Sequence, residues 1–255
     1  KQRERGQHCF RSFLLVFDGD VIILTEWWLG FKHQFWLNFI DGNRWHYITD
    51  GLKVTLELTF GAVILGIVIG FIVAIIRTTH DNTGRLKFLN WLCKIYLTVI
   101  RGTPVIVQLM IIYYFMLAPY RIPPVVCGII SFGINSGAYV AEIVRAGIMS
   151  IDKGQMEAGR SLGFNYLQTM VYIIAPQAFK NVLPALGNEF IVLLKETSVA
   201  GYISLMDLTK GGDIIRGRTL AVMPLLAVAL IYLVMVMFMQ NLLGRLERRL
   251  RQSDH

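Results

Sequence analysis

Long uncharged stretches constrain this chain more than any other feature of its sequence. Four of them contain no Asp, Glu, Lys or Arg: Leu58–Ile76, Gly102–Tyr120, Ile122–Ala141 and Thr219–Gly244. A helix needs about 20 apolar residues to cross the roughly 30 Å hydrocarbon core of a bilayer. Four such stretches in one chain therefore predict an all-α integral membrane protein rather than a soluble domain with buried helices.

The overall composition agrees with this prediction. Hydrophobic residues make up 55% of the chain, and the mean hydropathy is +0.53. A formal net charge of +8 can indicate nucleic-acid binding, but many of the charges flank the apolar stretches, as cytoplasmic loops require. We therefore expect no nucleic-acid partner. Cys9, Cys93 and Cys127 are widely spaced and form no CxxC, so neither a metal site nor a redox pair is predicted.

Five membrane spans are predicted from hydropathy and charge. Lys and Arg residues place the loop after the first span, the polar insertion at 148–178 and the C-terminal tail in the cytoplasm. The N-terminus then lies outside and the C-terminus in the cytoplasm. In the first span, Gly66 and Gly70 form a GxxxG that lets another helix approach closely. The spans cover about residues 52–76, 94–119, 125–147, 180–199 and 218–244.

Residues 1–45 are predicted to be an N-terminal extension or interfacial segment, ahead of a membrane domain at 46–250. Asp18 and Asp20 interrupt its apolar part, and each aspartate costs about 2.5–3.5 kcal/mol to insert. Tryptophans gather at membrane interfaces, and four of the five lie here: Trp27, Trp28, Trp36 and Trp45. The basic residues before position 12 favour the cytoplasm instead. If the first 30 residues crossed the bilayer, the chain would have six spans and an internal N-terminus.

The polar insertion contains a pattern of two short helices joined by a glycine. The first is predicted over Gln155–Leu162 and ends at Gly163, a favourable C-cap residue. The second is predicted over Tyr166–Ile174 and stops before Pro176. A helix–glycine–helix unit on a membrane surface offers a compact knob to the groove of a partner.

The same insertion resembles the EAA signature of ABC importer permeases, which runs Glu-Ala-Ala, three residues, Gly, nine residues, Ile, one residue, Leu-Pro. The residues that match at this spacing are Glu157, Ala158, Gly163, Ile173 and Pro176. Gly159 replaces the third residue of the signature, and Ala175 replaces its leucine.

Three further segments resemble the polar amino acid class of these permeases, which carries histidine, glutamine, glutamate or arginine. They are Arg101–Pro104 with Val107 and Gln108 after it, Asn135–Ile148, and Leu194–Ser198. They stand in the expected order around the signature. The resemblance covers about residues 45–245.

The resemblance implies a fold, an assembly and a location. It implies a MetI-like permease fold in the bacterial inner membrane, paired with a second copy or a sister subunit and surrounded by lipid. Two ATPase subunits would bind the cytoplasmic loop, and an extracytoplasmic solute-binding protein would deliver the substrate. The chain has no GxxxxGK[ST], so ATP and magnesium belong to the partner; we expect no cofactor and no catalytic residue here.

The resemblance assigns the ATPase contact to Glu157, Ala158, Gly159, Leu162 and Gly163. We expect Glu157 to cap or pair in the partner's groove and Gly163 to permit the turn.

Polar residues at membrane depth are the candidates for the substrate path, because charges there are costly and usually functional. An amino acid carboxylate favours a guanidinium, and its ammonium favours a carboxylate. Glu142 and Arg145 stand at i, i+3 and can pair with each other. A structural ion-pair network is therefore the alternative interpretation. The candidates are Arg101, Thr103, Ser136, Tyr139, Glu142, Arg145, Lys195 and Glu196.

Other kinds of membrane protein explain the sequence less well. An ion-coupled secondary transporter, the main alternative, normally shows more spans and internal repeats. A membrane enzyme needs a catalytic set, yet no HExxH is present and the five histidines are scattered. A channel leaves the signature insertion unexplained. Uptake that depends on a proton gradient without ATP would identify a secondary transporter.

Overall fold

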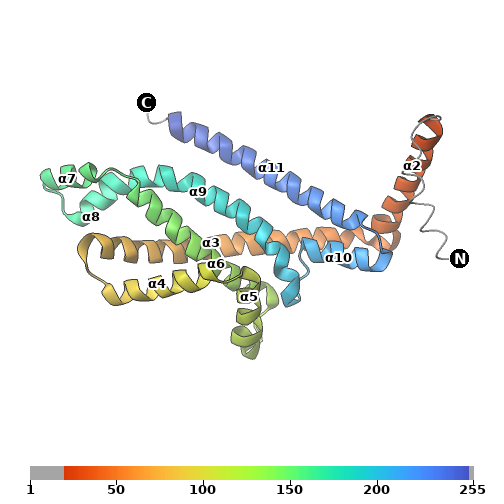
Figure 1. Cartoon of the computed structure of the whole chain (residues 1–255), viewed down its shortest axis with the longest axis horizontal. Coiled ribbons are helices and arrows are strands. Elements are labelled where there is room, and N and C mark those ends of the chain that lie inside the picture. Colours follow the sequence, from red (N-terminus) through yellow and green to blue (C-terminus); the bar gives the residue numbers. More distant parts are fainter. Residues whose placement is uncertain (1–19, 253–255) are drawn as a thin grey trace.

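The computed structural model describes residues 20–252, with side chains from 28 to 250. These residues form helices and no strand (Figure 1). What the sequence predicts for residues 1–19, including Cys9, lies outside the described part. In chain order the elements are α2 (Asp20–Phe35), η1 (Trp36–Ile40), η2 (Asp41–Asn43), α3 (Trp45–Thr83), α4 (Lys87–Gly102), α5 (Val105–Met110), η3 (Ile111–Leu117), η4 (Ala118–Tyr120), α6 (Pro124–Met149), α7 (Lys153–Ser161), α8 (Tyr166–Thr169), η5 (Met170–Ile174), α9 (Ala175–Glu196), η6 (Thr197–Ile203), α10 (Leu208–Thr219) and α11 (Met223–Gln252).

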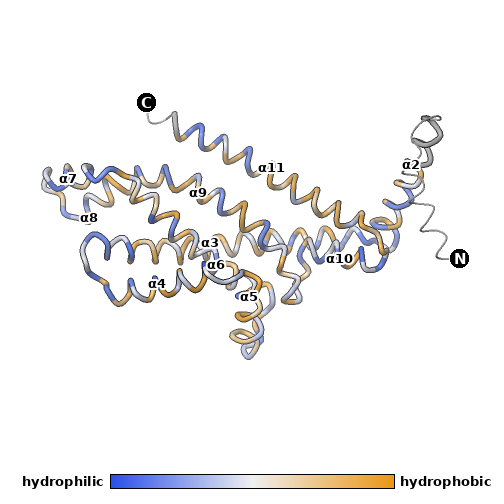
Figure 2. Tube along the Cα trace, in the orientation of Figure 1, coloured by the Kyte–Doolittle hydropathy of each residue, from blue (hydrophilic) through white to orange (hydrophobic). Residues whose placement is uncertain are grey.

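Three of the described helices, α3, α6 and α11, are long and apolar enough to cross a membrane alone, and there are four candidates if a bent pair counts as one span. They correspond to the predicted spans at 52–76, 125–147 and 218–244. In Figure 2 the hydrophobic residues of α11 give way to hydrophilic ones toward its C-terminal end. Helix α9 is not in this set, so the span at 180–199, and the count of five, stay predictions.

The predicted span at 94–119 is not one straight helix. It is α4 followed by α5 and η3, with a 111° bend between them. The cause is Pro104, which lacks an N–H and holds the preceding Thr103 in an extended conformation (φ −124°, ψ 149°). The buried Gln108 side chain then donates to the carbonyls of Ile100 (2.6 Å) and Thr103 (2.9 Å). The side chain of Asn135 in α6 donates to Gln108 at 2.9 Å, which ties the bend to the next helix.

Helices α3 and α6 form the most extensive contact in the described fold. Glycines allow it. A Cβ on Gly66 would lie 3.0 Å from Ser136, and one on Gly70 would lie 2.9 Å from the backbone nitrogen of Ala141. Gly137 of α6 returns the contact against Ile69, at 2.9 Å. The GxxxG of the first span therefore packs on the third, as its spacing predicts.

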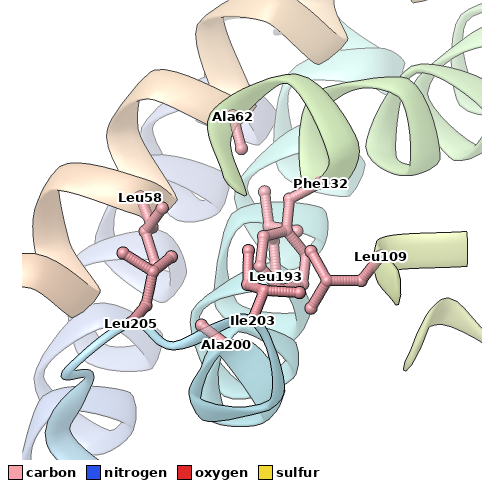
Figure 3. Close-up of a cluster of buried hydrophobic side chains, with 8 residues drawn as sticks. All are labelled: Leu58, Ala62, Leu109, Phe132, Leu193, Ala200, Ile203 and Leu205. Atoms are coloured by element: carbon pink, nitrogen blue, oxygen red, sulfur yellow. The ribbon is translucent and has the colours of Figure 1, made fainter. Parts of the chain in front are cut away.

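A cluster of buried apolar side chains joins this pair to α5, α9 and η6 (Figure 3). Because lipid is as apolar as leucine, close packing rather than the hydrophobic effect holds such a cluster together in a membrane. Its members are Leu58, Ala62, Leu109, Phe132, Leu193, Ala200, Ile203 and Leu205.

Helix α10 fills part of the loop between α9 and α11. Its N-cap is Asp207, whose carboxylate accepts from the backbone N–H of Thr209 at 2.9 Å. Burial raises the pKa of Asp207 above its ordinary value. A Cβ on Gly211 would overlap the Tyr47 carbonyl of α3, so α10 lies directly against the start of α3.

Candidate functional site

The insertion between α6 and α9 forms the predicted helix–glycine–helix unit. Helix α7 begins at the N-cap Asp152, whose carboxylate accepts from the Gly154 N–H at 2.6 Å. It ends in a Schellman arrangement, in which Gly163 N–H donates to the Arg160 carbonyl and Phe164 N–H to the Gly159 carbonyl. Gly163 has φ +87°, a conformation that favours glycine. The turn between the two helices therefore depends on this residue.

The second helix of the unit begins as predicted but does not stop before Pro176. Asn165 and Gln168 form a reciprocal capping box at the start of α8. The helical backbone then runs through the π-helical η5 directly into α9. The predicted stop is wrong because Ala175, the residue before Pro176, keeps helical backbone angles (φ −60°, ψ −41°); the restriction that proline places on the preceding residue is a preference and not a prohibition. The insertion and α9 are thus mechanically continuous.

The residues predicted to contact an ATPase lie mainly on the surface of this unit. Glu157, Ala158, Leu162 and Gly163 are exposed, whereas Gly159 is buried. A Cβ on Gly159 would lie 2.5 Å from Thr169 of α8, so this residue sets how closely the two short helices approach. Several apolar side chains around them face solvent, among them Leu162 (74% exposed), Leu167 and Tyr172.

A cavity of about 340 Å³ lies between this unit and the ends of α3 and α6. Asp81 and Asn82 line it from α3, Ile148 from α6, and Met156 and Glu157 from α7. Glu157 therefore borders both the exposed surface of α7 and the space beneath it.

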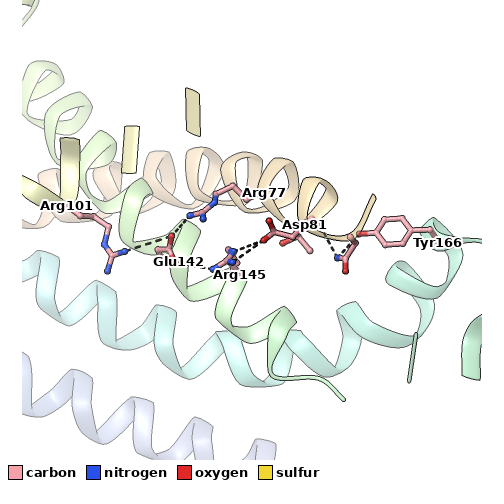
Figure 4. Close-up of polar contacts among 8 residues, drawn as sticks. Arg77, Asp81, Arg101, Glu142, Arg145 and Tyr166 are labelled. Carbon is pink, nitrogen blue, oxygen red and sulfur yellow. Dashed lines mark hydrogen bonds and ion pairs between the residues drawn. The ribbon is translucent and has the colours of Figure 1, made fainter. Parts of the chain in front are cut away.

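Beyond the cavity, charged side chains link α3, α4 and α6 (Figure 4). The carboxylate of Glu142 accepts from Arg77 at 2.6 Å. It also lies 3.9 Å from the guanidinium of Arg145, the predicted i, i+3 pair, and 4.0 Å from that of Arg101. Arg145 in turn pairs with Asp81 at 3.1 Å. The structure thus brings three of the predicted path residues into one ion-pair cluster.

A first span that ends at residue 76 puts Arg77 and Asp81 in the loop that follows it. Helix α3 instead continues to Thr83 and carries both residues alongside α6. The i, i+4 spacing of Arg77 and Asp81 was the available signal, because it puts both on one face of a continuing helix.

The remaining path candidates are divided among other places. Tyr139 receives the guanidinium of Arg101 over its ring, 5.6 Å from the centroid. Thr103 lies at the bend, where its hydroxyl donates to the Val99 carbonyl. Lys195 and Glu196 end α9, with Lys195 exposed and Glu196 half-buried.

Ser136, the last of these candidates, reveals a residue that was not predicted. Its hydroxyl donates to the carboxylate of Glu189 in α9 at 3.0 Å. Among the described residues, no Lys or Arg nitrogen lies within 4.0 Å of Glu189. An acid in the middle of the predicted span at 180–199 was the signal for it.

The comparisons with known proteins point in one direction. Residues 52–252 match the family model of the binding-protein-dependent transport system inner membrane component. The chain is 40% identical over 209 residues to a putative glutamine transport system permease protein of Rickettsia typhi, covering 80% of this chain and 93% of the relative. It is 35% identical to an arginine transport system permease protein of Bacillus subtilis, covering 82% of this chain and 94% of that one.

Solved structures agree with these relatives. One, described as an amino acid ABC transporter with histidines, matches with a TM-score of 0.75 and 43% identity, covering 83% of this chain and 98% of the other. An inward-facing methionine ABC transporter matches with a TM-score of 0.68 and 20% identity, over 80% and 95% of the two chains. The second likeness concerns the fold alone.

Proposed function

The chain belongs to the family of binding-protein-dependent transport system inner membrane components, and we propose that it is the permease subunit through which an ATP-driven importer carries a polar amino acid. Relatives at 35–40% identity are named for glutamine and arginine transport. A polar amino acid is the chemistry common to both names. The extracytoplasmic binding protein that the family's name implies would deliver it.

The exposed apolar surface of α7, α8 and η5 carries the proposal that an ATPase subunit binds there. Leu162, Leu167 and Tyr172 leave large apolar areas uncovered on a unit with two ordered helix starts. Such a rigid, apolar knob suits the groove of a partner protein. ATP and magnesium would be held by that partner, and the movement of α7 and α8 would reach α9 through the continuous backbone of η5.

The same proposal assigns each segment to one side of the membrane. In Figure 1 the C-terminal end of α11 and the α7–α8 unit lie toward one end of the molecule, and the start of α3 lies toward the other. With α7 and α8 in the cytoplasm, the C-terminus is cytoplasmic, and residue 45 is on the outside. The basic residues at the end of α11, such as Arg245 and Arg248, fit that side.

Glu189 and Ser136 are the residues we assign to the substrate's ammonium group. A carboxylate at membrane depth without a cationic neighbour is costly, and a bound ammonium would offset that cost. Glu142 and Arg145, in contrast, already have partners within the chain. We therefore propose that they brace α3 against α6 rather than bind the substrate.

Reconstituted transport tests the assignment of the importer. The chain, its ATPase and its binding protein are placed in vesicles, and uptake of labelled glutamine and arginine is followed with and without internal ATP. We expect uptake that needs ATP and survives a proton ionophore. Uptake that persists without ATP but stops with the ionophore would identify the secondary transporter instead.

Gly163→Pro tests the coupling unit within that system, because proline cannot adopt φ +87°. We expect uptake and binding-protein-stimulated ATP hydrolysis to fall about tenfold or more, since the turn between α7 and α8 is lost. Gly244→Ala in α11 is the control, because nothing lies within 4 Å of its added Cβ. Normal coupling in the Gly163→Pro protein would remove the proposed role of this turn.

Glu189→Gln tests the substrate site. We expect uptake to fall about tenfold, with ATP hydrolysis without substrate unchanged, because the amide keeps the size but not the charge that pairs with an ammonium. Glu57→Gln, at an exposed ion pair with Lys53, is the matched control. If the KM for uptake did not change in the Glu189→Gln variant, Glu189 would be excluded from the substrate site.

A further inference from the structure

Helix α2 and the short η1 lie outside the part of the chain that the family model matches, which begins at residue 52. In Figure 1, α2 leaves the start of α3 at a steep angle, at the end of the molecule away from α7 and α8. A helix that spans the bilayer beside α3 would run along it. The direction of α2 instead places it across the axis of the first span.

One face of α2 carries a continuous row of aromatic rings. Trp28, Phe31, Phe35 and Phe39 follow one another with ring centroids 5.9, 6.5 and 5.1 Å apart. Residues at i, i+3 and i+7 share a helix face. The first three rings are exposed, whereas Phe39 is buried where η1 meets the rest of the fold. The row therefore leads outward from the protein into its surroundings.

The side of α2 away from the row is mixed. His33 and Gln34 are exposed there, and so is Leu29 (64%). Lys32 flanks the row, with its ammonium 5.2 Å from the centroid of the Trp28 ring. An exposed aromatic row with a lysine ammonium at its border suits a helix at a membrane surface, where rings enter the acyl boundary and the charge stays in water.

The base of α2 is fixed to the membrane domain. Asn38 is fully buried and donates to the Gln34 carbonyl at 2.7 Å. Arg44 donates to the Leu37 carbonyl and pairs with Asp41 at 3.1 Å. Segment η1 also contacts α3, α10 and α11. These contacts hold the direction of α2 relative to the first span.

We propose that α2 lies in the headgroup layer of the bilayer, on the side opposite the α7–α8 unit, with Trp28, Phe31 and Phe35 directed at the acyl boundary. Aromatic rings, and tryptophan above all, favour that layer over both water and the hydrocarbon centre. The outer end of α3, reached through Arg44, meets the same layer. The helix then sets the depth of the first span and resists its sliding along the bilayer normal.

Depth-dependent fluorescence quenching tests this placement. In the full chain reconstituted in vesicles, Trp27, Trp36, Trp45 and Trp91 are replaced with phenylalanine, so that Trp28 alone reports. Lipids then carry bromine either near the headgroups or near the ends of the acyl chains. We expect the shallow bromines to quench Trp28 at least about twofold more than the deep ones.

A deep reference uses the same background with Trp28→Phe and Phe238→Trp, at a 60%-exposed position on α11, and we expect the opposite order of quenching. Stronger quenching of Trp28 by deep bromines would mean that α2 enters the hydrocarbon core. Weak quenching by both lipids would mean that water or protein covers it. Either result overturns the proposal.

The paired change Phe31→Ser and Phe35→Ser, in the Trp28 reporter, tests the aromatic row itself. These rings are exposed, so the substitutions leave the buried cluster around Phe132 intact. We expect shallow quenching of Trp28 to fall about twofold, because the helix loses much of its interfacial attraction. The Phe238→Trp reference carrying the same pair should not change. Unchanged quenching of Trp28 would show that the row does not hold α2 at the membrane.

Discussion

Helices α3 and α6 meet along their length, but the two halves of their contact are built differently. In one half, Gly66, Gly70 and Gly137 let the backbones approach so closely that an added Cβ would lie 3.0 Å or less from the facing helix. In the half nearer α7 and α8, Arg77 and Asp81 of α3 reach Glu142 and Arg145 of α6 through charged pairs. The first half has one arrangement, because close-packed surfaces cannot slide without overlap.

The charged half is different in kind. Long side chains can exchange partners while their backbones move, and the Glu142 carboxylate already lies within 4.0 Å of three arginines. One helix pair can therefore be rigid at one end and adjustable at the other. A movement of α7 and α8 would then turn α6 about the glycine contact.

Gly70→Ala is expected to damage the rigid half most. The new Cβ overlaps Val140 and lies 2.9 Å from the backbone nitrogen of Ala141. The backbone cannot move aside as the tip of a side chain can. We therefore expect the free energy of unfolding to fall by about 3 kcal/mol. The measurement is the unfolding midpoint of the purified complex in detergent, by loss of helical circular dichroism. Gly244→Ala, with open space around its Cβ, should leave the midpoint unchanged or raise it; equal effects at the two sites would deny that α3 and α6 pack closely.

Glu142→Gln is expected to act on the centre of the charged half. Arg77 is only 14% exposed, so removing the carboxylate leaves a largely buried cation with no full counter-charge. We expect the free energy of unfolding to fall by about 2 kcal/mol, which is the cost of one unsatisfied charged group reduced for the partial exposure of the pair. We expect uptake to fall with it, while the KM for substrate stays constant, because we assign Glu142 to the brace between α3 and α6 and not to the substrate. A raised KM with unchanged stability would return Glu142 to the substrate site.

The ion pair between Arg145 and Asp81 can be tested by exchanging its two charges. Each single exchange, Arg145→Asp or Asp81→Arg, should cost about 1 kcal/mol, since both side chains are partly exposed. The double exchange restores one attraction across the helices, so most of the loss in stability and uptake should return. A double-mutant cycle measures the coupling. Additive losses in the double variant would show that the two residues do not act as a pair.

The sequence predicted the elements of the fold well and their contacts less well. Run lengths located α3, α6 and α11 because hydrophobic length is a local property. The bend at Thr103 was also local, since a residue before proline is restricted, but an uninterrupted apolar run concealed it. Which face of α3 meets α6 is not local, and so the roles of Arg77 and Asp81 became visible only when the helix was seen to continue.

The candidate site divides in the same way. Gly163 was predicted to end a helix as a C-cap residue. Its φ of +87° is the conformation that makes glycine favourable at that position. Glu142 and Arg145 were placed together by their spacing. The pairing of Ser136 with Glu189 joins positions 53 residues apart, and no spacing rule in a single sequence reaches that far.

A hydrogen bond connects the charged half of α3 with the α7–α8 unit. Asn82 at the end of α3 donates to the Tyr166 hydroxyl at 3.3 Å, in an exposed hydrogen bond (Figure 4). Tyr166→Phe removes only that hydroxyl, so stability should change by about 0.5 kcal/mol or less. The informative measurement is the ratio of solute imported to ATP hydrolysed. If this contact passes movement from α8 to α3, the ratio should fall while hydrolysis continues, and Asn82→Ala should lower it equally. A further fall in the double variant would contradict this, because two partners in one hydrogen bond cannot lose it twice.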